Sequence, residues 1–298
     1  MAALLLLCFL WSLGSLRIDL LPVLDNHTLP PMEKQALPLA FLAITASLLA
    51  ITKRRRWPQR RQVFTAILIG LGLFVVPALL VSLSNQGISE LTRVALFSLV
   101  PVFTVVLEPH VSGTTGQQRR GALIAALIAV GGTLCIFPAQ VPNSITAAAA
   151  FGAVVLAAAC IGAANCFAVT AATESPITTT AAIAGITALA SFAMLGPFVE
   201  RETWTWHGIG PELAWSAVVG LPALLLLFWL MSRMSAVRMT TRFVIAPLMT
   251  ALIGIALFRP EVSLRDILGF VLIAAGACWL LFAPDEEPDD ASQRLKLN

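Results

Sequence analysis

Long apolar stretches separated by short polar connections run through the whole chain. Ten windows are apolar enough and long enough to cross a bilayer as a helix, which takes about 20 residues. The windows are 3–22, 36–52, 63–83, 91–107, 121–138, 146–172, 178–199, 212–231, 241–258 and 266–283. The pattern therefore predicts an all-α integral membrane protein with ten transmembrane helices. The first window lacks the basic start and the cleavage pattern of a signal peptide, so we interpret it as a retained span.

A short sequence recurs in the two halves of the chain. Pro77-Ala78-Leu79-Leu80 returns as Pro222-Ala223-Leu224-Leu225, at an offset of 145 residues. Three further residues return at an offset of 146: Phe97, Pro101 and Thr104 match Phe243, Pro247 and Thr250. Five apolar windows separate equivalent points, and an odd number of crossings turns the second copy upside down. We therefore predict two inverted five-helix repeats, over 1–140 and 141–283, and then an acidic cytoplasmic tail, 284–298, which we expect to be disordered.

The distribution of basic residues predicts which side of the membrane each connection faces. Connections on one side carry 13 of the 19 Lys and Arg residues, including the run KRRRWPQRR at 53–61. Because basic residues are enriched in cytoplasmic loops, both termini are predicted to be cytoplasmic, in an inner or plasma membrane. The run at 53–61 is interpreted as a topology anchor, with an anionic-lipid site as the alternative.

Composition excludes several classes of protein. The chain is 58% hydrophobic and 12% charged, with a mean hydropathy of +0.88, which leaves no stretch for a separate soluble domain. We expect the lipid bilayer and a small molecule as partners, and no nucleic acid, because the one dense basic run lies between membrane windows. The histidines lie in predicted connections, the cysteines have no metal or redox spacing, and the sequence has no phosphate-binding glycine loop. We therefore predict no enzyme activity, no metal and no cofactor.

Each half carries the same succession of features: a proline in its fourth window, an acidic residue after it, and glycines in its fifth window. These are Pro101, Glu108 and Gly131-Gly132 in one half, and Pro247, Glu261 and Gly269 to Gly276 in the other. With its opening LWSLGSLRIDLLP, the chain resembles the EamA-type members of the drug/metabolite transporter superfamily over about residues 8–283. The resemblance implies export or uptake of small metabolites by alternating access.

The two prolines at equivalent places, Pro101 and Pro247, are candidate cavity residues. Proline cannot donate to the carbonyl four residues earlier, which belongs to Phe97 or to Phe243. A freed carbonyl in hydrocarbon must face protein or a water-filled cavity. We predict that these residues line a substrate cavity; the alternative is a pair of packing kinks without ligand contact.

Polar residues inside or beside the windows are further candidates for substrate contact. Asn165 lies near the middle of the sixth window, where its amide needs either a substrate or a neighbouring helix as partner. Trp11 and Ser15 lie four residues apart in the first window and so share a helix face. Asn85 follows the third window at its predicted outer end.

Four arginines near window ends are candidate gates or charge sites. Arg17 is placed to attract an anionic substrate group, or to extend to the interface and pair with an acidic neighbour. Arg93 lies at the outer mouth between the third and fourth windows, and Arg238 and Arg242 hold the equivalent place on the cytoplasmic side. Each mouth is interpreted either as a gate or as a solvated turn with helix caps.

The sequence thus predicts a secondary transporter of small metabolites, such as amino acids or similar neutral or zwitterionic compounds, acting in export by alternating access. The sparse charge inside the windows also suits lipophilic cargo, so a multidrug exporter is the alternative. A membrane scaffold without transport activity is the third possibility.

Overall fold

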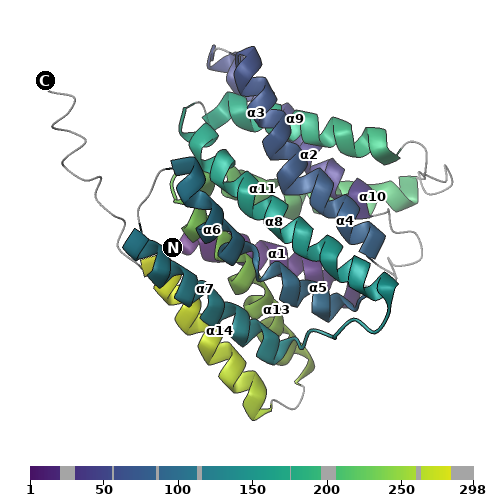
Figure 1. The fold of residues 1–298 in the computed structure, drawn as a ribbon. Helices are drawn as coiled ribbons and strands as arrows, with labels where there is room; N and C mark the ends of the chain where they lie inside the picture. The colour runs from purple at the N-terminus through teal and green to yellow at the C-terminus, as the bar shows by residue number, and fades with distance from the viewer. Residues whose placement is uncertain are drawn as a thin grey trace, which may run out of the picture.

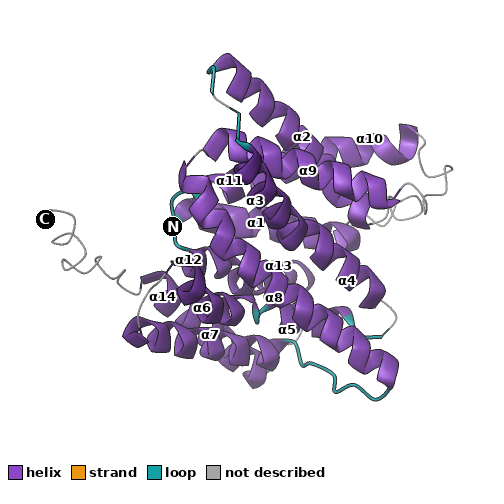
Figure 2. Cartoon of the chain, turned by 45° about the horizontal axis from the view of Figure 1, so that its top comes forward, coloured by secondary structure: helices purple, strands orange, loops and turns teal. Residues whose placement is uncertain are grey.

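The computed structural model describes residues 1–20, 31–55, 57–84, 87–112, 116–174, 176–195, 206–259 and 263–282. Over these residues all regular secondary structure is helical (Figure 2). The segments are α1 (Ala2–Leu20), α2 (Pro31–Thr52), α3 (Arg60–Gly70), η2 (Leu71–Val75), α4 (Val76–Ser84), α5 (Glu90–Phe97), α6 (Val100–Ser112), α7 (Gly116–Ile136), α8 (Ile145–Glu174), α9 (Pro176–Leu195), α10 (Trp206–Trp215), η4 (Ser216–Gly220), α11 (Leu221–Met231), α12 (Ala236–Thr240), α13 (Arg242–Phe258) and α14 (Leu264–Phe282). They fall on the ten predicted windows, so the all-α prediction is confirmed; the predicted acidic tail lies outside the described residues.

Consecutive helical segments join into longer helical rods. In the described part, eight of these rods are long and apolar enough to cross a membrane. They are Gln35–Thr52, Arg60–Ser84, Glu90–His110, Ile145–Val169, Ile177–Met194, Ile209–Met231, Ala236–Phe258 and Leu264–Phe282. The apolar parts of α1 and α7, Ala2–Gly14 and Arg120–Ile136, are shorter. Large apolar side chains also point outwards from the bundle, as Leu189 and Val218 do at 72% and 71% exposure. Such an apolar exterior suits lipid rather than water, in agreement with a multi-pass membrane protein.

Two of the rods contain a π-helical turn that ends two residues before a proline. The turns are η2 (Leu71–Val75), before α4 and Pro77, and η4 (Ser216–Gly220), before α11 and Pro222. In each, the first N–H after the turn donates to the carbonyl five residues earlier. A proline ring collides with the carbonyl four residues earlier in a regular α-helix, so a wider preceding turn relieves the collision. The two turns are 145 residues apart, the offset of the repeated tetrapeptide.

Pro101 and Pro247, the prolines of the fourth and ninth predicted windows, lie in different local structures, in contrast to Pro77 and Pro222. Pro101 is the second residue of α6, because the chain turns at Ser98 and Leu99 between α5 and α6. A proline in a first helical turn frees no helical carbonyl. Pro247 lies inside α13, the longer helix of its rod. The predicted equivalence of these two prolines therefore does not extend to their helical position.

The rods pack in pairs that join the two halves of the sequence (Figure 1). Helix α2 packs along α9, α7 along α14, and α1 along α13, while the long α8 contacts both α4 and α6. The main core cluster draws buried residues from both halves, among them Leu7, Leu42, Ile161 and Leu227. The chain therefore forms one bundle rather than two separately packed halves.

Helices α7 and α14 lie side by side at one edge of the bundle (Figure 1), and small residues allow their backbones to pack closely. A Cβ atom on Gly132 would lie 2.7 Å from the Gly269 carbonyl oxygen, and one on Gly276 would lie 2.6 Å from the Ala125 carbonyl oxygen. Backbone can approach backbone in this way only where a side chain is missing. Gly132, Gly269 and Gly276 therefore act in helix packing, whereas a Cβ atom on Gly131 would meet nothing within 4 Å.

Candidate functional site

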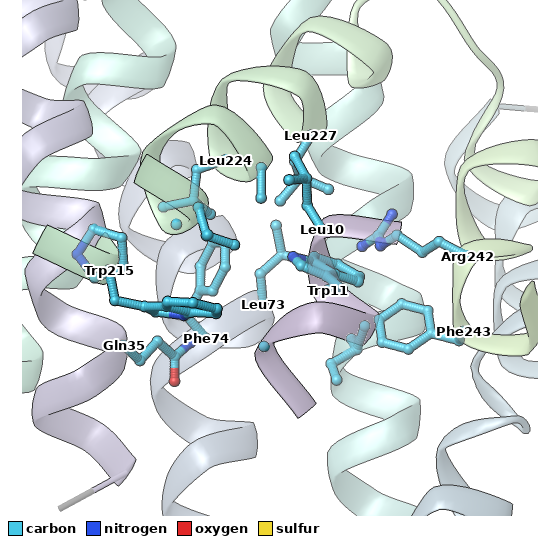
Figure 3. Close-up of a pocket in the computed structure, with 16 residues that line it drawn as sticks. Leu10, Trp11, Gln35, Leu73, Phe74, Trp215, Leu224, Leu227, Arg242 and Phe243 are labelled. Carbon is cyan, nitrogen blue, oxygen red and sulfur yellow. The ribbon is translucent and has the colours of Figure 1, made fainter. Parts of the chain in front are cut away.

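A cavity of about 350 Å³ lies among α1, α2, α8, α11, α13 and the two π turns (Figure 3). Its lining residues are Leu10, Trp11, Gly14, Gln35, Pro38, Leu73, Phe74, Ile161, Trp215, Val219, Gly220, Ala223, Leu224, Leu227, Arg242 and Phe243. It extends from Arg242 and Phe243 at one end to Gln35 and Trp215 at the other (Figure 3). Its volume is at the lower end of the range for ligand pockets, about 300–1,000 Å³. The space therefore suits one small molecule.

Both π turns contribute to the cavity wall. Leu73 and Phe74 come from η2, and Val219 and Gly220 come from η4. Gly220 also allows α2 to approach, since a Cβ atom there would lie 2.7 Å from the Pro38 Cβ. The prolines that widen these two turns therefore shape the wall, although the prolines themselves do not line it.

The single charged residue of the described lining is Arg242, at the start of α13. Its side chain is 2% exposed. The Nη2 atom donates to Asn165 Oδ1 at 3.0 Å and Nη1 donates to the Met239 carbonyl oxygen at 3.0 Å, while the buried Nε has no hydrogen-bond partner. All of these acceptors are neutral. No carboxylate of the described residues forms an ion pair with this guanidinium.

Two aromatic rings hold Arg242 on its cavity side. The guanidinium carbon lies 4.7 Å from the ring centre of Phe243 and 5.4 Å from that of Trp11. The two rings are 6.2 Å apart and tilted by 52° to each other. Aromatic faces attract a desolvated cation, and this attraction partly offsets the loss of water around a buried guanidinium. Figure 3 shows Trp11 between Arg242 and the apolar wall.

Asn165, on α8, is the side-chain partner of Arg242 and is itself fully buried. Its Nδ2 atom donates to the Ile161 carbonyl oxygen at 2.8 Å, which leaves Oδ1 to accept from Arg242. Sequence reasoning left two partners open for this amide, a substrate or a neighbouring helix. The structure gives it the neighbouring helix, and Asn165 does not line the cavity.

The alternative that Arg242 belongs to a solvated turn is wrong, whereas its assignment as a gate residue stays a prediction. The guanidinium and the neighbouring Thr241 are both buried, because α12 ends one residue earlier and α13 begins inside the bundle. Arg238, the other member of that predicted mouth, is half-buried on α12. Arg93 is half-buried on α5 and does not line the cavity.

The structure brings together only part of the predicted substrate site. Trp11 and Phe243 line the cavity, whereas Phe97, Pro101 and Pro247 do not. Phe97 is half-buried against the main core cluster and Pro101 is buried. Three further predictions were Ser15, Arg17 and Asn85: the side chains of the first two, and the whole of the third, lie outside the described residues.

Sequence reasoning missed several residues of this site. Gln35, Phe74 and Trp215 line the cavity (Figure 3), and of these Phe74 had a signal in its place close before the repeated tetrapeptide. Glu212, a carboxylate on α10 that is 4% exposed, lies one turn from Trp215.

Comparison with known proteins shows the fold alone. No family model matches this sequence, and no curated protein sequence matches it. A solved structure described as "Crystal structure of protein" is similar over 95% of this chain and 99% of that chain. The TM-score is 0.75 and the sequence identity is 15%.

Proposed function

We propose that this chain is a secondary transporter that moves small metabolites across an inner or plasma membrane by alternating access, in the manner of EamA-type drug/metabolite transporters. The observation that carries the proposal is the central cavity, enclosed by helices from both halves of a membrane-spanning bundle. Binding sites of secondary transporters lie near the membrane midplane between two repeats. We assign the direction as export and place both termini in the cytoplasm.

An inverted repeat over residues 1–140 and 141–283 is part of this proposal. The rods Arg60–Ser84 and Ile209–Met231 would then be equivalent. Each has a π turn before its proline, and the two π turns are 145 residues apart, like the repeated tetrapeptide. The packing of α1 on α13 would then correspond to that of α8 on α6. These paired features support a two-fold relation between the halves.

Alternating access needs one end of the cavity to be closed. In the proposed topology Gln35 and Trp215 lie at the outer end, and Arg242 lies at the cytoplasmic end. The Arg242–Asn165 hydrogen bond joins α13 to α8 there. Rearrangement of this contact would open the cavity to the cytoplasm.

A multidrug exporter is the second candidate, because the described lining is mostly apolar and aromatic. The buried cation favours a polar metabolite over a purely lipophilic drug. Lipophilic drugs need no charge at the end of their site, and a buried charge lowers the affinity for them.

Metabolite export is the test of the transport proposal. Cells expressing the native chain, the cavity variant Gly14→Leu or the control Gly152→Leu are compared at matched membrane abundance, and their media are profiled. A Cβ atom at either glycine would have no neighbour within 4 Å, but only Gly14 lines the cavity. We expect a metabolite that accumulates with the native chain and with Gly152→Leu but not with Gly14→Leu. Media indistinguishable from those of empty cells would contradict export.

A further inference from the structure

We propose that the transported compound is a small monocarboxylate with an apolar body, and that Arg242 binds its carboxylate. The inference rests on the proposed transport function and names the substrate class of the same cavity. It also extends beyond amino acids to organic acids without an amine.

The first step of the argument is the charge balance around Arg242. A guanidinium has five N–H donors and remains charged at neutral pH. Here its acceptors are the neutral Asn165 Oδ1 and Met239 carbonyl oxygen, and Nε has no acceptor. A buried charge is expensive unless an opposite charge accompanies it. Among the described lining residues none is acidic, so a bound ligand can supply the opposite charge.

The second step is the chemistry of that ligand. A carboxylate matches the planar fork of an arginine, and charge-assisted hydrogen bonds are about twice as strong as neutral ones. An incoming carboxylate can therefore replace Asn165 Oδ1 at Nη2. One positive charge balances one negative charge, whereas a phosphate dianion would leave a charge uncompensated in an apolar cavity.

The third step is the rest of the cavity. Trp11, Phe74 and Phe243, with leucines from η2 and α11, give it an apolar wall. This wall fits an alkyl or aryl body, and about 350 Å³ limits the size of that body. An ammonium group is tolerated, because aromatic faces attract cations. It is not required, because no acidic group of the described lining is there to bind it.

Binding of four six-carbon probes tests the assignment, with the full chain solubilised in detergent. Hexanoate carries only a carboxylate, norleucine a carboxylate and an amine, hexylamine only an amine, and hexyl phosphate a phosphate. Thermal-shift titration gives the relative affinities. We expect hexanoate and norleucine to bind, and hexylamine and hexyl phosphate to bind at least 10-fold more weakly.

Two variants connect the carboxylate to Arg242. Arg242→Met removes the cation, and Asn165→Asp supplies a carboxylate from the protein at the position of Asn165 Oδ1. Both are expected to weaken hexanoate binding at least 10-fold, and Gly152→Leu is expected to leave it unchanged. Asn165→Asp keeps the guanidinium paired, so it tests the assignment even if Arg242→Met does not fold.

Three results would overturn the assignment: no binding of hexanoate to the native chain, hexylamine or hexyl phosphate binding as tightly as hexanoate, or hexanoate affinity unchanged in Asn165→Asp. These results are distinct from failure of the transport proposal. An exported metabolite without a carboxylate would leave transport standing and overturn the carboxylate. Hexanoate binding that depends on Arg242, in cells that export nothing, would support the ligand class and contradict transport.

Discussion

Two helix contacts in the middle of the bundle are built in opposite ways. Where α8 meets α6, a Cβ atom on Gly162 would lie 3.0 Å from the Phe103 Cβ and 3.2 Å from the Thr104 nitrogen. Where α1 meets α13, large side chains keep space open, and a Cβ atom on Gly14 would meet nothing within 4 Å. The first contact is closed and the second borders the cavity.

The difference follows from the size and polarity of the residues at each contact. Small residues on α8 let the backbones approach until Cys166 Sγ lies 3.9 Å from the Thr104 carbonyl oxygen. At the other contact Trp11 and Phe243 have bulky rings that hold a buried cation between α1 and α13. The proposed two-fold relation would make these two contacts equivalent. Their difference therefore distinguishes the closed side of the bundle from the side that borders the cavity.

The largest loss of stability is expected when a large side chain is placed in the closed contact between α8 and α6. Leucine at position 162 must push α6 away from α8, because the nearest atoms include backbone. We expect Gly162→Leu to lower the free energy of unfolding by about 3 kcal/mol. Unfolding in mixed micelles, with Gly152→Leu on the same helix as control, measures this; equal stability of the two variants would mean that the contact is loose.

A smaller loss is expected when Arg242 is deprived of its amide acceptor. Asn165→Leu leaves Nη2 of a buried guanidinium without its partner on α8. We expect a loss of about 2 kcal/mol in unfolding free energy, and a smaller loss for Asn165→Asp, which keeps an acceptor. The same micelle titration applies, and equal losses for both variants would argue that volume rather than hydrogen bonding matters at this site.

Filling the open contact should change binding rather than stability. In Gly14→Leu the new side chain enters the cavity, and leucine favours a helix over glycine by up to about 1 kcal/mol. We expect unchanged or slightly raised stability together with loss of hexanoate binding. A marked destabilisation would show that the space beside Gly14 is needed for folding.

The smallest loss of stability is expected from removing the hydrogen bond that joins α1 to α13. Ser12 Oγ lies 3.0 Å from the Ala246 carbonyl oxygen and 2.8 Å from that of Cys8 in its own helix. Side-chain hydrogen bonds between membrane helices contribute about 0.6 kcal/mol on average. We expect Ser12→Ala to lower the free energy of unfolding by about that much. The loss is small because the Ser12 hydroxyl can also donate to the Cys8 carbonyl oxygen within α1, so the bond to α13 adds little. A loss as large as that of Asn165→Leu would contradict this weak tie.

The hydrophobic pattern predicted the positions of the helices well, because lipid requires long apolar helices whatever their packing. It did not predict the segmentation of the rods. The π turns before Pro77 and Pro222 were signalled by the repeated tetrapeptide, but the break at Ser98 and Leu99 depends on local packing. The same limit explains why Pro101 and Pro247, alike in sequence, differ in helical position.

The site was only partly predictable, because its central contact joins residues 77 positions apart. Asn165 and Arg242 were both candidates, yet as separate groups, one near the middle of the sixth window and one at the cytoplasmic mouth. A basic residue near a window end indicates a loop by charge statistics. Burial of Arg242 depends on the distant Trp11 and on the short α12, and neither is visible in the sequence around Arg242.

The π turns have a consequence for helix register. Each holds one residue more than an α-helical turn of the same height, and one residue corresponds to about 100° of rotation around the helix axis. Deleting a single residue from η2 or η4 would restore a regular helix and rotate one end of the rod against the other. Phe74 and the face of α4 that packs on α8 could not then both keep their places. The shape of the cavity wall is therefore encoded in a one-residue phase shift as well as in the side chains that line it.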